Sequence, residues 1–465
     1  MMAKNDIFSY PEELKQPFVE TEDINFRYGE KVSASEIWNF MTQEAPKKFP
    51  YAFDTSSNYI GKLSDDVDAG FLSGIKRGYL SLSMRDRLLK AHEKGVPISL
   101  IQGGQPMEPY FAAGGISLRP GFIMQWARDM QDGMNLRTAD QRGIEILESG
   151  RTKISIEACN QIAAHAAIDD RIVPVDLIAP YLCMRCSDMA YLVESHRNKN
   201  NIPRLLVDHP VEHENRDWSV EYVATMIRTL TEKISSLSGK IVSDKDLNTE
   251  IKLHNQTRKL TREYVKLWWS APVPPTNSVD NSGIVMHGNE PRGEPVATKQ
   301  VLEESFKEVK ERVKHSVKGK GLVDDPARLF VCGSCVGPNP YNVEKAGGVL
   351  VGRDDNWSIV NIDVKETGDP YENLARAMLS FPYEQPTEKR AEWTADQVRK
   401  SRADGLMFMY QWGCNYQTAI ARMMADIIKD RTGIPTTFIE IGELGRLEAL
   451  QQSENRVEAF IEMLN

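Results

Sequence analysis

The sequence predicts an α/β protein with two domains, each built on a parallel sheet, joined by a helical segment and preceded by an N-terminal extension. Two observations predict this. In roughly the last 140 residues, short apolar runs alternate with segments of helical period, which is the pattern of parallel βαβ units. The chain of 465 residues also exceeds the roughly 100–200 residues of one domain.

Composition narrows the class of protein. Hydrophobic residues make up 41% and charged residues 26%, as in ordinary globular proteins, so a disordered chain is excluded. Six cysteines are too few for a disulfide scaffold, and a net charge of -9 argues against a nucleic-acid partner. No apolar run approaches the ~18 residues that a membrane span needs. We therefore expect a cytoplasmic protein without a membrane partner, whose cysteines are reduced.

The N-terminal half divides into an extension and a first domain. Residues 1–65 mix acidic and aromatic side chains without a clear period, and we expect them to pack on the body as an extension. Residues 66–218 form the first α/β domain. Its expected helices are 85–94 and 109–115, and its expected strands are 97–101, 173–179 and 202–207.

The middle of the chain, residues 219–320, reads as a helical connector with a linker. Apolar side chains from Tyr222 to Ile234 share one helical face, and Gly239 ends that helix. Residues 244–269 repeat the pattern at greater length. Residues 271–296 are rich in Pro, Gly and Asn and predict a linker, after which an apolar stripe from Val301 to Val317 predicts another helix.

The second α/β domain covers residues 321–465. Its elements alternate between the two periods along the chain. The expected strands are 328–331, 349–351, 405–410 and 437–441, and the expected helices include 343–345, 388–402, 419–429 and 457–464.

Five of the six cysteines follow predicted strands. Cys183 and Cys186 follow the strand at 173–179, Cys332 and Cys335 follow 328–331, and Cys414 follows 405–410. In open α/β sheets, ligands bind beyond the carboxyl ends of the strands, beside helix N-termini. The sixth, Cys159, lies in a helix-like segment before the first of these strands. The placement predicts a metal or cluster site.

Three interpretations of these thiols stay open at this point. Zinc motifs usually bring two Cys-x-x-Cys pairs within ~15–20 residues, and here far more chain intervenes. Thiolates from distant segments suit an iron–sulfur cluster at least as well, because soft sulfur ligands favour it. Alternatively, some of the thiols are small buried hydrophobes.

Other motifs are weaker. No Walker A loop or dinucleotide fingerprint is complete, so any ATP that matters to this protein must be bound by another chain. Glu108, just before a predicted helix, reads first as a surface or helix-start carboxylate.

Several segments together resemble the 2-hydroxyacyl-CoA dehydratase/benzoyl-CoA reductase family, over roughly residues 90–465. The resemblance rests on short stretches of sequence, and residues 1–65 match nothing that we can name. These stretches are Pro106-Met107-Glu108, 112–115, 176–186, Leu237-Ser238-Gly239-Lys240, Gly413-Cys414-Asn415 with Met423-Met424, 431–435, Phe438-Ile439-Glu440 and 455–464.

The resemblance implies two Rossmann-like domains that hold one [4Fe-4S] cluster between them. The family's three ligands would be Cys159, Cys186 and Cys414, leaving one iron open to water or to a substrate oxygen. The implied reaction is dehydration of a 2-hydroxyacyl-CoA to an enoyl-CoA. One electron turns the thioester carbonyl into a ketyl radical anion, which expels the hydroxyl and makes the beta proton acidic. Glu108 matches a family carboxylate near the substrate and would transfer a proton.

The resemblance also implies partners: an acyl-CoA substrate, a homologous sister subunit, and a separate ATP-hydrolysing iron–sulfur activator. The chain departs from the three-ligand pattern because Cys183, Cys332 and Cys335 are additional ligand candidates. Six thiolates could hold a double-cubane [8Fe-9S] cluster, as in a reductase branch of the family. We favour one cubane, since cysteines associated with that branch are missing, with the extra thiols packing around it. A benzoyl-CoA-type ring reductase subunit and a zinc-stapled α/β binding protein are the alternatives.

Overall fold

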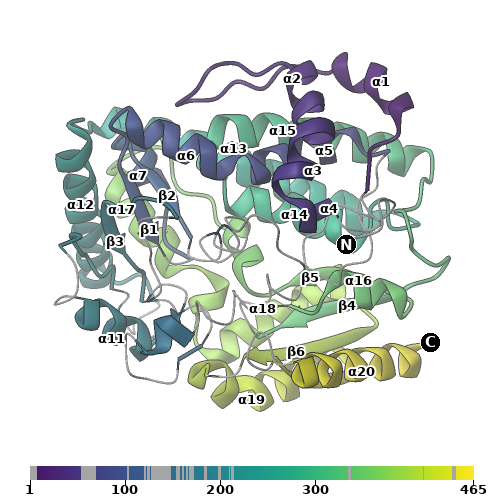
Figure 1. The fold of residues 1–465 in the computed structure, drawn as a ribbon. Coiled ribbons are helices and arrows are strands. Elements are labelled where there is room, and N and C mark those ends of the chain that lie inside the picture. The colour runs from purple at the N-terminus through teal and green to yellow at the C-terminus, as the bar shows by residue number, and fades with distance from the viewer. Residues whose placement is uncertain are drawn as a thin grey trace.

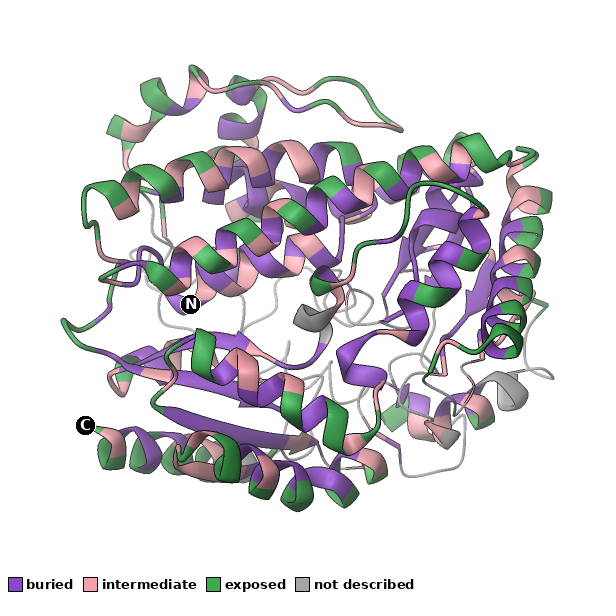
Figure 2. Cartoon of the chain, turned by 180° about the vertical axis from the view of Figure 1, so that it is seen from behind, coloured by how far each residue is buried: buried purple, intermediate pink, exposed green. Residues whose placement is uncertain are grey.

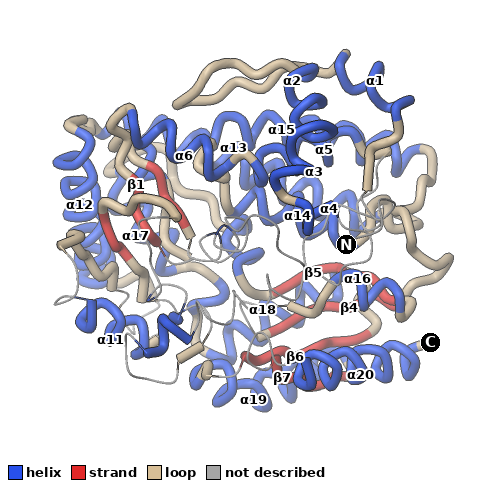
Figure 3. Tube along the Cα trace, viewed as in Figure 1, coloured by secondary structure: helices blue, strands red, loops and turns tan. Residues whose placement is uncertain are grey.

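The computed structural model confirms the α/β class, with two separate parallel sheets surrounded by helices (Figures 1 and 3). The strand orders are β2-β1-β3 and β5-β4-β6-β7. Cys183 and Cys335 fall outside the described residues. The structure describes residues 8–53, 70–101, 104–119, 122, 126, 148–152, 158–159, 162–163, 166, 172–182, 186–196, 201–208, 210, 214–333, 337–411, 413–441 and 447–465.

The first sheet is small and is extended by single bridges. β1 (Ile98–Ile101) pairs in parallel with β2 (Ile116–Leu118) and β3 (Leu177–Ala179). The predicted strand 202–207 forms only isolated parallel bridges, at Arg204 and Val207. Pro180 and Pro203 lack amide hydrogens, so the ladder between these segments is interrupted. Helices of this region are α6 (Met84–Glu93), α7 (Glu108–Ala112) and α11 (Ser187–His196).

The second sheet is buried on both faces, which is why its strands read as continuous apolar runs (Figure 2). One face packs on α16 and α20, and the other on α13, α14, α18 and α19. Its elements are β4 (Ala327–Cys332), α16 (Pro340–Lys345), β5 (Gly348–Arg353), η4 (Asn356–Asn361), α17 (Pro370–Leu379), η5 (Pro382–Glu384), α18 (Thr387–Lys400), β6 (Gly405–Gln411), α19 (Asn415–Thr432), β7 (Thr436–Ile441) and α20 (Leu447–Leu464).

Four helices make up the connector: α12 (Asp217–Ser238), α13 (Asp244–Ser270), α14 (Ser278–Asn289) and α15 (Pro295–Lys314). The linker expected at 271–296 is wrong, because α14 fills its middle. Asn277 caps that helix through its side chain, and a Cβ at Gly288 would strike Thr261 of α13. The Asn and Gly that suggested a linker therefore serve as a helix cap and a close helix contact.

The N-terminal residues form short helices around an aromatic core that includes Phe18, Trp38 and Phe53. This core also takes in α5 (Leu72–Leu82) and α15, so the extension packs on the body (Figure 1). The short helices are η1 (Glu12–Leu14), α1 (Lys15–Val19), α2 (Ala34–Asn39), η2 (Phe40–Glu44), α3 (Ala45–Lys48) and α4 (Pro50–Phe53). The exact domain boundaries stay a prediction. Across the described part of the chain, no helix combines the length and apolar character of a membrane span.

After the second domain has begun, the chain returns to the first. α17 packs on α12, where Leu374 and Met378 join a core that contains Val220 and Val223. The following segment, η5, leads back to α18 beside the second sheet. This crossing joins the two domains through a shared apolar core.

Candidate metal centre

Three of the predicted ligands lie at the facing ends of the two domains. Cys414 is the N-cap residue of α19, directly after β6, and Cys186 directly precedes α11. The structure also describes Cys159 and the residue before it, Ala158. All three cysteines are half-buried, and none of them forms a disulfide.

The backbone at Gly413 touches the backbone at Cys159. Gly413 has φ +80°, and a Cβ there would lie 2.9 Å from the amide nitrogen of Cys159 and 3.1 Å from the carbonyl carbon of Ala158. Only glycine allows both this φ and this approach. The contact brings Cys414 and Cys159 side by side although 255 positions separate them in sequence (414 − 159).

Cys186 completes the group. Burial, together with smaller contributions from the charges of Asp188 and Cys414, raises the pKa of Cys186 to about 11. Cys186 and Cys159 also pack on one apolar cluster, which contains Ile162 and Met189. The structure therefore brings the three cysteines of the resemblance to one place.

Thiolates are soft donors, which suit iron–sulfur clusters and zinc. Among the described residues, no three His, Cys, Asp or Glu side chains converge closely enough to bind one metal ion. Burial raises the pKa of Cys186 and of Cys414, so both thiols stay protonated at neutral pH until a metal displaces the proton.

Cys332 has different surroundings. It is fully buried at the end of β4, and its thiol donates a hydrogen bond to Asp354 at 3.1 Å. Asp354 also accepts from the Gly333 amide at 2.9 Å and from Nε of Arg390 at 2.9 Å. Burial, together with the Asp354 charge, holds the pKa of Cys332 well above its usual range.

Arg390 extends this hydrogen-bond network from Asp354 to Gln417, which lies near Cys414. Its guanidinium is fully buried, lies 4.1 Å from the ring centre of Tyr383 and contacts Gln417 at 3.5 Å. Burial alone would lower the pKa of Arg390, but Asp354 more than offsets this, so the group stays charged. Gln417 lies in the first turn of α19, and the charge of Arg390 counters the burial that raises the pKa of Cys414.

Sequence reasoning did not find this network. Arg390 and Asp354 are separated by 36 positions, and nothing local in the sequence pairs them. A signal was present in Asp354 itself, which directly follows β5 at the carboxyl edge of the sheet.

Glu108 begins α7, as expected of a helix-start carboxylate, but it is fully buried and not on the surface. It pairs with Arg258 of α13 at 2.5 Å. Burial would raise the pKa of Glu108, but the charges of Arg258 and His254 outweigh it, so the pKa is lowered. The second oxygen, Oε2, accepts no hydrogen bond from another described residue.

A cavity of about 30 Å³ lies beside this ion pair, which is room for one or two waters. Its lining includes Arg258, His254 and His287 together with Gln105, Pro106 and Met107. Near neutral pH the carboxylate is thus ionised, with one oxygen held by Arg258 and the other free to accept a proton.

Fold and site together define an α/β protein with a thiol-lined centre between two parallel-sheet domains. Residues 103–464 match the family model described as 2-hydroxyglutaryl-CoA dehydratase, D-component, and the chain belongs to this family. This confirms the resemblance found in the sequence.

One curated relative is a subunit of the benzoyl-CoA reductase of Thauera aromatica. It is 26% identical over 228 residues, which cover 45% of this chain and 55% of the relative. The chain therefore spans about half the length of that relative.

Proposed function

We propose that this chain is the iron–sulfur subunit of a radical acyl-CoA enzyme that works with a separate ATP-hydrolysing activator. The favoured reaction is dehydration of a 2-hydroxyacyl-CoA to an enoyl-CoA. The observation that supports this most directly is the meeting of Cys159, Cys186 and Cys414 between two domains of a chain that belongs to this family.

Different residues of the chain would have different roles in this reaction. Cys159, Cys186 and Cys414 would hold a [4Fe-4S] cluster, which when bound supplies single electrons at low potential. Their half-buried position limits water around the centre. The buried charge of Arg390 would favour the thiolate form of Cys414 and the more negative, reduced state of the centre.

Glu108 would move a proton. Its lowered pKa keeps it ionised at neutral pH, and Oε2 is available to accept. Arg258 fixes the orientation of the carboxylate, because the two side chains form a buried ion pair.

Two alternatives from the same family, a benzoyl-CoA-type ring reductase subunit and a double-cubane reductase, differ in substrate and iron number. The hydrogen bond from the Cys332 thiol to Asp354 favours one cubane, since this thiol already has a partner in the core. A zinc-stapled binding protein is the alternative from another class.

Metal analysis of protein purified without oxygen tests the proposal. We expect about four irons and four sulfides per chain, whereas about eight irons would indicate the double cubane and zinc without sulfide the binding protein. Cys414→Ser should lose iron and the visible absorbance. Cys332→Ser is the control, because serine can still donate to Asp354 and the iron should stay. A colourless, metal-free but folded wild-type protein would refute the proposal.

A further inference from the structure

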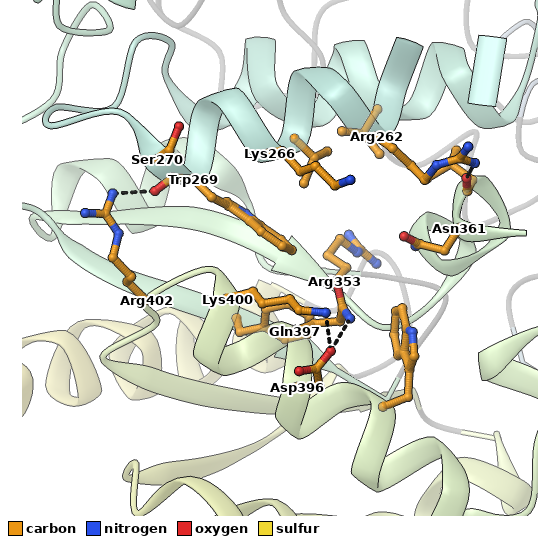
Figure 4. Close-up of a pocket in the computed structure, with 16 residues that line it drawn as sticks. Arg262, Lys266, Trp269, Ser270, Arg353, Asn361, Asp396, Gln397, Lys400 and Arg402 are labelled. Atoms are coloured by element: carbon orange, nitrogen blue, oxygen red, sulfur yellow. Dashed lines mark hydrogen bonds and ion pairs between the residues drawn. The ribbon is translucent and has the colours of Figure 1, made fainter. Parts of the chain in front are cut away.

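A second concave site lies farther along the connector helix α13, past the residues that line the small cavity. A cleft of about 670 Å³ opens between the last turns of α13, the end of β5 and α18 (Figure 4). Small-molecule sites usually have volumes of ~300–1,000 Å³. The three cysteines of the metal centre do not line it.

Positive charge dominates the cleft. Its lining includes five cationic side chains and one carboxylate; the cations are Arg262, Lys266, Arg353, Lys400 and Arg402. The carboxylate, Asp396, pairs with Lys400.

Within the described part of the chain, two cations of the lining have no ion-pair partner. Arg262 is paired with Asp363 and Arg353 with Asp355, both from outside the lining. Arg402 donates to the backbone carbonyls of Trp269 and Ala271. The exposed ammonium of Lys266 has no ion-pair partner within the described residues, and Figure 4 shows it on the α13 wall. The cleft thus offers charge to an incoming anion.

Aromatic surface accompanies this charge. The indole of Trp269 is fixed by a 2.7 Å hydrogen bond from Nε1 to the carbonyl oxygen of Val351, and Trp393 lies on the α18 wall. Both rings are partly exposed. A flat ring and anionic groups on one ligand would match this combination, since indoles stack on planar rings and cations pair with phosphates.

We propose that this cleft binds the adenine nucleotide end of a coenzyme A ester. The inference rests on the proposed function, because coenzyme A carries phosphates and adenine at one end and the reacting thioester at the other. Chain connectivity supports the placement. Arg353 lines the cleft at the carboxyl end of β5, and the next residue, Asp354, binds Cys332 and Arg390 beside the metal centre. The cleft therefore borders the sheet edge where the cysteines gather.

Calorimetry with adenosine 3′,5′-bisphosphate tests the inference on protein purified without oxygen. We expect the wild type to bind this nucleotide more tightly than inorganic phosphate, and Lys266→Glu to weaken binding at least tenfold. Lys252→Glu is the matched control, because Lys252 is exposed on the same helix about 21 Å away; binding should not change. Trp393→Leu should reduce the preference for the nucleotide over phosphate.

Absence of nucleotide binding by the wild type, or equal weakening by both lysine variants, would overturn the inference. Iron and sulfide analysis of the same samples separates this failure from that of the proposed function. Protein that holds iron and sulfide but binds no nucleotide refutes only the cleft. Protein that binds the nucleotide through Lys266 but holds no cluster refutes only the metal centre.

Discussion

The contact between Gly413 and Cys159 makes a quantitative prediction for Gly413→Ala. A non-glycine residue at φ +80° costs about 1–2 kcal/mol of backbone energy. The new Cβ would also lie 2.9 Å from the amide nitrogen of Cys159, where the obstacle is backbone and cannot rotate away. Overpacking of this kind costs about 1–3 kcal/mol more. We therefore expect the free energy of unfolding to fall by about 2–5 kcal/mol.

Gly433→Ala is the matched control. Gly433 has φ +73°, but nothing lies within 4 Å of its Cβ position, so only the backbone cost of about 1–2 kcal/mol applies. Urea titrations of the metal-free proteins measure the difference between the two variants. Iron analysis after reconstitution should show that Gly413→Ala loses iron, because Cys159 is displaced, while Gly433→Ala keeps it. Equal destabilisation with full iron in both would show that the close contact is wrong.

Three further predictions concern buried ionisable side chains. Arg390→Gln should lower the reduction potential of the reconstituted centre, measured by redox titration with electron paramagnetic resonance, and Arg390→Lys should recover most of it; an unchanged potential in the Gln variant would contradict the role. Glu108→Leu leaves Arg258 buried without its partner and should reduce the free energy of unfolding by about 3–5 kcal/mol in urea, whereas a loss below 1 kcal/mol would show that the pair is not needed. Burial lowers the pKa of His287 well below its usual range, so the folded state stays unprotonated while the unfolded chain gains a proton below about pH 6.5. The contribution of His287 to stability should thus fall by up to about 1.4 kcal/mol per pH unit below 6.5, and the difference in stability between the wild type and His287→Gln in urea titrations should change by about that amount between pH 7.5 and 5.5.

Local patterns were enough to predict most of the second sheet. Strands β4, β5 and β6 are almost entirely buried, so they appear in the sequence as mainly apolar runs, whereas β7 is only partly buried and was found from the apolar residues at its centre. The helix α17 was not predicted, although Asp369 caps it and Pro370 opens its first turn. In the first domain, the strand predicted at 173–179 is shorter in the structure, because β3 covers only Leu177–Ala179 and Pro174 lacks the amide hydrogen that a ladder needs.

The site, too, could be predicted from local sequence patterns only in part. The positions of the cysteines after strands predicted that they meet, because the carboxyl ends of parallel strands share one edge of a sheet. The charged partners could not be found in this way. Glu108 and Arg258 are 150 positions apart, and Arg27 reaches Glu250 across 223. Such pairs depend on how helices pack in three dimensions, which no local spacing encodes.

The net charge of -9 argues against a nucleic-acid partner, but it says little about which ligands a concave site can bind. Surface carboxylates act on partners that approach over a broad area, and salt screens them beyond about 8–10 Å. Inside the cleft, the cations Lys266 and Arg402 lie close to any bound ligand, so their attraction acts over a short distance. An acidic protein can therefore bind a polyanionic ligand such as a nucleotide, provided that its positive charges are concentrated where the ligand enters. This predicts that nucleotide binding at the cleft weakens with salt, whereas the buried Arg390 beside the cysteines acts independently of it.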